Sequence, residues 1–104
     1  MVTTGDPARD ALSARWLDLT RRRLPAAVRP GWPVRFDHCF QRILLDHACG
    51  GRWSDRFDGR PAYAHAPAAV LTRAVDLGEA VLAGAADLAA LNRQSLVWRG
   101  KRRT

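Results

Sequence analysis

The chain has 104 residues, 47% of them hydrophobic and 26% charged, which is typical of one small globular domain and excludes a disordered chain. No stretch approaches the roughly 20 apolar residues of a membrane span, and the first residues carry no secretory signal, so we expect a cytoplasmic protein without a membrane partner. The two cysteines are too few for a disulfide framework, and the net charge of +7 favours polyanionic partners such as nucleic acid.

Hydrophobic residues repeat at helical spacing along most of the chain, which predicts an all-α domain of about four helices. The first helix begins at the Asp6-Pro7 start signal and ends by Leu24-Pro25, because proline is poorly tolerated inside a helix. The four helices are expected at about 7–24, 36–49, 67–84 and 87–100. Together they form one domain over 1–104, in which 1–5 and 101–104 are flexible ends.

Two connecting segments contain residues that interrupt helices. Residues 25–33 hold three prolines and a glycine, and they are predicted to form a linker. Residues 50–66 are predicted to be irregular, because Asp58-Gly59 is a turn signal. This second segment is expected to pack over the second helix and to bring Trp53 and Tyr63 onto it.

The second helix contains both cysteines and two of the three histidines. The residues on its predicted core face are Phe36, Cys39, Phe40, Ile43 and Leu44. Cys39 and Cys49 lie ten residues apart, about 15 Å along a helix, which is too far for a disulfide. No His or Cys pair has the spacing of a zinc site, and neighbours such as His38 and Cys39 point about 100° apart on a helix. We therefore predict no metal site and no cofactor.

A polar flank of the same helix is the strongest candidate for a functional site. It consists of Asp37, His38, Arg42 and Asp46. Two carboxylates, an imidazole and a guanidinium within three turns are suited to general acid–base catalysis if a loop covers them. In the structural alternative, Arg42 and Asp46 form an ion pair along the helix, since they are four residues apart. A covered flank would also form a polar pocket beneath Trp53 and Tyr63, as in a small-molecule-binding protein or a small enzyme.

Arginine accounts for 16 of the 17 cationic residues, and aromatic residues are interleaved with two of the arginine groups. Arginine forks neutralise phosphates and aromatic rings stack on bases, so our leading hypothesis is a non-enzymatic nucleic-acid-binding domain. The predicted contact residues are Arg21, Arg22, Arg23, Arg52, Trp53, Arg56, Arg60, Arg99, Lys101, Arg102 and Arg103. A basic surface that is only solvated is an open alternative. Another is a protein-interaction module or homodimer that uses surplus apolar residues such as Leu45 and Val97.

Four groups of residues between 36 and 101 form a recognisable pattern. They are His38-Cys39-Phe40-x-Arg42-Ile43-x-Leu45-Asp46, Trp53, Arg60-Pro61-Ala62-Tyr63 and Leu91-Asn92-x-x-Ser95-Leu96-x-Trp98-Arg99-Gly100-Lys101. The pattern resembles a family of small uncharacterised proteins from bacteria and fungi, some of which are labelled acetyltransferase-like. The resemblance implies that the whole chain is one domain, and it implies no particular activity.

Overall fold

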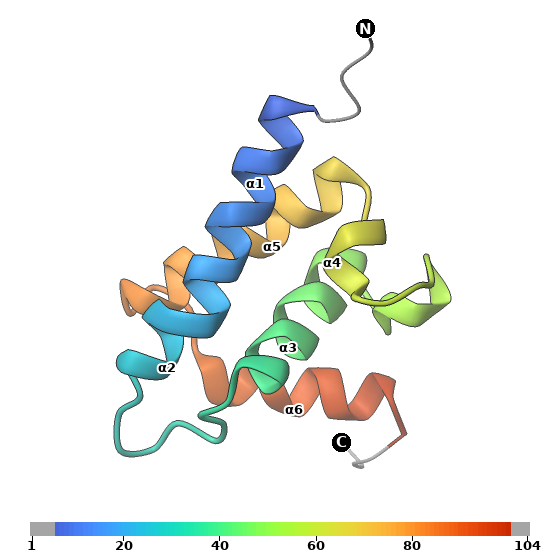
Figure 1. The fold of residues 1–104 in the computed structure, drawn as a ribbon. Helices are drawn as coiled ribbons and strands as arrows, with labels where there is room; N and C mark the ends of the chain where they lie inside the picture. The colour runs from blue at the N-terminus through green and yellow to red at the C-terminus, as the bar shows by residue number, and fades with distance from the viewer. Residues whose placement is uncertain (1–5, 101–104) are drawn as a thin grey trace, which may run out of the picture.

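The computed structural model describes residues 6–100, which form an assembly of helices joined by turns and loops (Figure 1). The predicted all-α fold is confirmed, with four helices of seven or more residues and no strand within the described part of the chain. The long helices are α1 (Pro7–Asp18), α3 (Asp37–Cys49), α5 (Ala68–Leu82) and α6 (Leu88–Trp98). The shorter elements are η1 (Leu19–Arg23), α2 (Leu24–Ala26), η2 (Trp53–Asp55) and α4 (Ala62–His65).

The helix ends follow local signals in the sequence. The Asp6 carboxylate caps α1 by accepting a hydrogen bond from the Ala8 backbone N–H at 3.0 Å. Asp87 caps α6 in the same way, with the Ala90 N–H as donor at 3.2 Å. Gly50 ends α3 in the left-handed conformation, with φ of 70°, which glycine adopts without steric cost.

The first helical run extends further than predicted. After α1, the five-residue π-helix η1 leads into α2, which carries the chain through Pro25 to Ala26. The Leu24 backbone N–H donates to the Leu19 carbonyl, five residues earlier, as a π-turn requires. A proline ring crowds the carbonyl four residues before it, and a wider turn relieves that crowding. The predicted end at Leu24-Pro25 is therefore wrong.

The core is built around α3, which crosses the middle of the molecule between α1 and α6 (Figure 1). The same helix packs against η1 and α5, so it is covered on several sides. Leu45, predicted to be a surplus apolar residue, is buried for this reason, with 2% of its surface exposed. Phe36, predicted to face the core, is 60% exposed because it precedes the first turn of α3.

The 50–66 segment packs over α3, as predicted, and two interactions hold it there. At one end, the Trp53 backbone N–H donates to the Asp46 carboxylate at 3.0 Å. At the other end, the Arg9 guanidinium of α1 donates to the carbonyls of Tyr63 and Ala66, both at 2.6 Å. Within residues 6–100, no helix has both the length and the apolar character that crossing a membrane demands.

Candidate functional site

A buried polar network joins α3 to α6. Asp46 has no exposed surface, and its carboxylate accepts two hydrogen bonds from Arg99, from Nε at 2.7 Å and from Nη2 at 2.9 Å. The Ser95 hydroxyl donates to the same carboxylate at 2.7 Å, and the Trp53 N–H supplies the fourth donor. A buried carboxylate needs hydrogen-bond donors and a positive counter-charge, because an unpaired charge in the interior is strongly unfavourable.

Arg42 does not pair with Asp46, so the predicted ion pair along α3 is wrong. Its Nη1 donates to the Ser95 hydroxyl and its Nη2 to the Asn92 side-chain carbonyl, both at 2.7 Å. The Arg99 fork already occupies Asp46, and Ser95 bridges the two charged groups. Burial lowers the pKa of the Arg42 guanidinium, and the neighbouring charge of Arg99 acts in the same direction. An arginine nevertheless stays charged at neutral pH.

Arg42 also reaches a pocket of about 260 Å³ between α3 and the 53–63 segment. The residues that line it are Trp16, His38, Gln41, Arg42, Leu45, Trp53, Arg60, Pro61, Ala62 and Tyr63. This is where the sequence predicts a pocket, and four residues named for that site do line it: His38, Arg42, Trp53 and Tyr63. None of the ten lining residues is acidic.

The two carboxylates predicted for acid–base catalysis do not meet in this pocket. Asp37 lies exposed at the start of α3, where its carboxylate accepts a hydrogen bond from the His38 backbone N–H at 2.8 Å. Asp46 is directed to α6 and is covered by its four donors. The His38 ring stacks on Phe36 with 6.0 Å between ring centroids. The four candidates therefore form no assembled acid–base site in this structure.

Trp16 is a lining residue that the sequence does not single out. It comes from α1, where its position in the apolar stripe indicates only a core residue. The side chain is fully buried, and its indole Nε1–H has no hydrogen-bond partner among the residues that the structure describes. Buried polar groups are nearly always hydrogen-bonded, so an unpaired donor on a residue that lines a pocket is a reason to look for an acceptor there.

Asn92 and Ser95 are also missed as site residues by sequence reasoning. Besides their place in the pattern that carries the family resemblance, their signal is the presence of two polar side chains on the helical face that α6 turns towards the core. Their function in the fold is clear from the contacts: both accept hydrogen bonds from the Arg42 guanidinium, and Ser95 connects it to Asp46.

The predicted nucleic-acid-contacting arginines do not gather on one face. Figure 1 places η1, which holds Arg21, Arg22 and Arg23, and the 52–60 segment on opposite sides of α3. Several of these residues are paired within the fold: Arg22 with Asp18, Arg23 with Glu79, Arg52 with Asp55, and Arg99 with Asp46. Within residues 6–100, Arg21, Arg56 and Arg60 make no side-chain hydrogen bond. Lys101, Arg102 and Arg103 lie outside the described residues.

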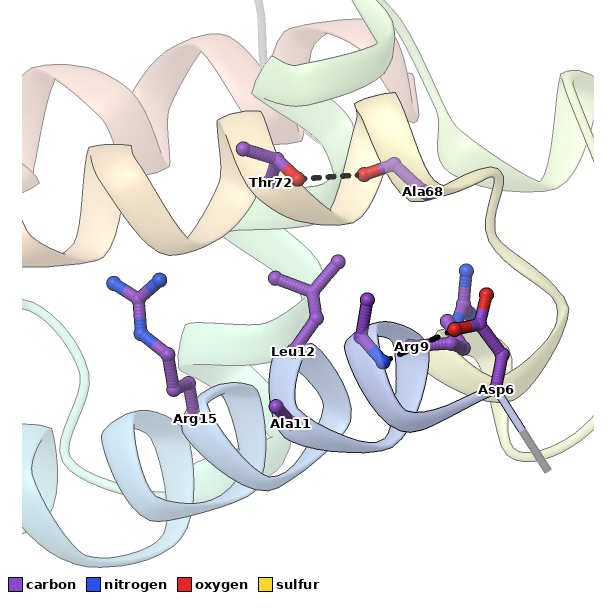
Figure 2. Close-up of a pocket in the computed structure, with 8 residues that line it drawn as sticks. Asp6, Arg9, Ala11, Leu12, Arg15, Ala68 and Thr72 are labelled. Carbon is purple, nitrogen blue, oxygen red and sulfur yellow. Dashed lines mark hydrogen bonds between the residues drawn. The ribbon is translucent and has the colours of Figure 1, made fainter.

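A larger and shallower hollow of about 600 Å³ lies between α1 and α5 (Figure 2). Figure 2 shows Leu12 and Arg15 of α1 directed towards α5 across this hollow. Its other polar groups already have partners: Asp6 caps α1, and the Thr72 hydroxyl donates to the Ala68 carbonyl at 2.8 Å. The Arg15 guanidinium makes no hydrogen bond within residues 6–100, but none of the residues that line the hollow is aromatic, unlike those at the Arg42 pocket.

The histidine and cysteine side chains form no metal centre in the described part of the chain, where no three His, Cys, Asp or Glu side chains are grouped to hold an ion. Both cysteines are free thiols. Burial raises the pKa of the Cys49 thiol, which disfavours the reactive thiolate. Cys39 does not line the pocket at Arg42.

No protein family, no curated protein and no solved structure matches this chain. The resemblance to small bacterial and fungal proteins therefore stays a prediction. Several residues that carry that resemblance nevertheless meet in space. Arg42, Asp46, Asn92, Ser95 and Arg99 form the buried network, and the 60–63 group lines the pocket.

Proposed function

We propose that this domain binds a small anionic molecule in the pocket between α3 and the 53–63 segment. The observation that carries the proposal is the Arg42 guanidinium, which reaches an aromatic-lined pocket without a carboxylate in contact with it. Two of its N–H groups bond to Ser95 and Asn92. Since a guanidinium has five N–H donors, others remain for a ligand.

The charge balance of the buried network supports an anion rather than a neutral molecule. Arg42 and Arg99 contribute two positive charges, and Asp46, which pairs with Arg99 and is linked to Arg42 through Ser95, contributes the one negative charge of the network. One positive charge is therefore left over beside the pocket. A partly buried charge without a counter-charge is unfavourable, and a bound anion would supply one.

The size of the pocket supports a small ligand. Pockets that enclose drug-sized molecules have volumes of about 300–1,000 Å³. The volume here, about 260 Å³, is below that range. A nucleic acid strand would not enter such a pocket, although a single carboxylate, phosphate or sulfonate compound would.

The test is a titration of the full chain with four probes, namely acetate, benzoate, inorganic phosphate and phenyl phosphate, observed by NMR of the tryptophan indole N–H groups. We expect at least one probe to shift the resonances of Trp16 and Trp53, which line the pocket. Trp32 and Trp98 do not line it and serve as internal controls. The proposal fails if no probe at millimolar concentration shifts the two lining tryptophans.

A pair of variants separates the pocket from general charge effects. Arg42→Gln removes the guanidinium that reaches the pocket, and Arg21→Gln removes an exposed arginine of η1. We expect Arg42→Gln to weaken probe binding by at least about tenfold and Arg21→Gln to leave it unchanged. Far-UV circular dichroism checks that each variant is folded. Equal loss in both variants would indicate binding through net charge alone.

Nucleic-acid binding stays a second proposal, supported by the exposed residues Arg21, Arg56 and Arg60. Binding of this type would weaken steeply as salt rises, since it depends on counterion release. A fluorescent oligonucleotide titrated at low and at physiological salt measures this directly. Arg21→Gln would weaken such binding and Arg42→Gln would not, which is the reverse of the expectation for the pocket. Homodimerisation also stays a prediction, and a solution mass measurement tests it.

A further inference from the structure

We infer that the ligand of the Arg42 pocket is a planar monocarboxylate, with benzoate as its simplest representative. This inference rests on the proposed function and names the chemical class of the ligand. Three independent features of the pocket lead to it: the surplus charge, the available buried donors and the aromatic walls.

The surplus charge matches a monoanion. Arg42 and Arg99 together exceed the charge of Asp46 by one unit, and no acidic side chain is among the ten lining residues. A carboxylate would bring the buried cluster to neutrality. A phosphate dianion would leave it with an uncompensated negative charge, which is costly away from water. Arg60 and His38 also border the pocket, but they are exposed, so water screens their contribution.

The hydrogen-bond donors of the two lining residues Arg42 and Trp16 match the two oxygens of a carboxylate. Arg42 supplies guanidinium N–H groups that Ser95 and Asn92 do not use. Trp16 supplies an indole N–H that is buried and has no acceptor within the described residues. One carboxylate oxygen on the guanidinium and the other on the indole would satisfy both groups. A neutral amide of the same shape would offer one good acceptor and would not neutralise Arg42.

The walls of the pocket match a planar apolar body. Trp53 and Tyr63 are half-buried lining residues, and each is held in place through its backbone. The Trp53 N–H bonds to Asp46, and the Tyr63 carbonyl accepts a hydrogen bond from Arg9. The Trp53 ring also packs against Phe57, with 5.4 Å between centroids. Fixed aromatic walls favour a flat ring, which stacks or packs edge to face against them.

The experiment compares benzoate, benzamide and phenyl phosphate by isothermal titration calorimetry on the full chain. These probes share a phenyl ring and differ in charge, which is the property under test. We expect benzoate to bind at least about tenfold more tightly than either of the others. In the same titration followed by NMR, we expect benzoate to shift the Trp16 indole N–H resonance and benzamide to shift it less.

A variant tests the indole donor. Trp16→Phe keeps an aromatic ring in the core and removes the N–H, so we expect about tenfold weaker benzoate binding and little change for benzamide. Arg21→Gln is the control that should bind benzoate as the wild type does. If Trp16→Phe does not fold, the indole N–H resonance of Trp16 in the wild-type protein is the deciding measurement. The inference is overturned if saturating benzoate leaves that resonance unshifted.

The possible failures are distinguishable. If phenyl phosphate shifts Trp16 and Trp53 and binds more tightly than benzoate, the inference that the ligand is a carboxylate is overturned. The proposal of an anion-binding pocket would then still stand. Equal binding of benzamide and benzoate would overturn the charge argument on which both proposals depend. An absence of binding by all anionic probes would overturn the proposed function itself.

Discussion

Asp46 is the residue on which the buried polar contacts converge. Its carboxylate accepts four hydrogen bonds from three residues: Ser95 and Arg99 of the α6 region, and Trp53 of the covering segment. The Asp46 side chain therefore fixes α6 against α3 and also holds Trp53, the first residue of the covering segment that lines the pocket. A buried carboxylate of this kind is strongly coupled to the fold, because removing it leaves guanidinium groups without a counter-charge.

We predict that Asp46→Asn lowers the free energy of unfolding by about 3 kcal/mol, because the shape is kept while the charge that neutralises Arg99 is lost. Urea denaturation followed by circular dichroism measures the change. Asp55→Asn is the matched control, since Asp55 pairs with Arg52 at the surface, where water screens the pair. A loss in Asp46→Asn no larger than in the control would show that the buried network contributes little.

At the scale of elements, Gly78 of α5 lies where η1 and α3 pack closely against that helix. A Cβ atom at this position would lie 2.5 Å from Leu19 Cδ2 and 3.1 Å from Leu44 Cδ1. Leu19 belongs to η1 and Leu44 to α3, and both are fully buried, so neither has free space to move into. Glycine inside a helix is unfavourable by itself, and here it allows three elements to pack together.

We predict that Gly78→Ala lowers the free energy of unfolding by about 1 kcal/mol. Alanine improves helix propensity by roughly 1 kcal/mol, while overpacking in a filled core costs roughly 2 kcal/mol. Thermal and urea unfolding measure the net effect. The control is Gly51→Ala, because a Cβ there meets no atom within 4 Å and the residue does not have positive φ. A stabilised Gly78→Ala variant would contradict this account of the packing.

At the scale of the whole molecule, charged side chains connect segments that are distant in sequence. Arg23 of η1 and Glu79 of α5 form a bidentate ion pair, with both N–O distances at 2.7 Å. The hydrogen bond from Arg23 is the main reason that the pKa of Glu79 is lowered. A carboxylate whose pKa is lower in the folded state stabilises that state at neutral pH, and this contribution is lost as the pH falls through the folded pKa.

We predict that Glu79→Gln reduces the melting temperature at about pH 7. The difference from the wild type should disappear once the pH has fallen through the lowered folded-state pKa of Glu79, because the wild-type glutamate is then protonated as well. Circular dichroism melts at a series of pH values follow the convergence. The control is Asp76→Asn, also on α5, which should show the same dependence of the melting temperature on pH as the wild type. The reason is that Asp76 makes no ion pair or hydrogen bond within residues 6–100. A pH-independent difference between Glu79→Gln and the wild type would contradict this.

The sequence by itself determined the features of this protein that depend on neighbouring residues. The helices over Asp37–Cys49, Ala68–Leu82 and Leu88–Trp98 follow from their apolar spacing, and Asp87 and Gly50 mark helix ends through bonds and dihedral angles within a few residues. The general position of the pocket also followed, because the turn signals after Gly50 return the chain over the preceding helix. These are short-range effects that local chemistry decides.

Only the tertiary structure decided which polar groups meet. Arg99, 53 residues after Asp46 in the chain, displaces the nearer Arg42 from that carboxylate, because its fork arrives on a helix that packs across α3. Arg42 is thereby left to line the pocket together with Trp16 of α1, a residue that only the packing of helices far apart in sequence brings close to α3. Residue spacing specifies the partners available within one helix, whereas the choice between them depends on how helices far apart in sequence pack against each other.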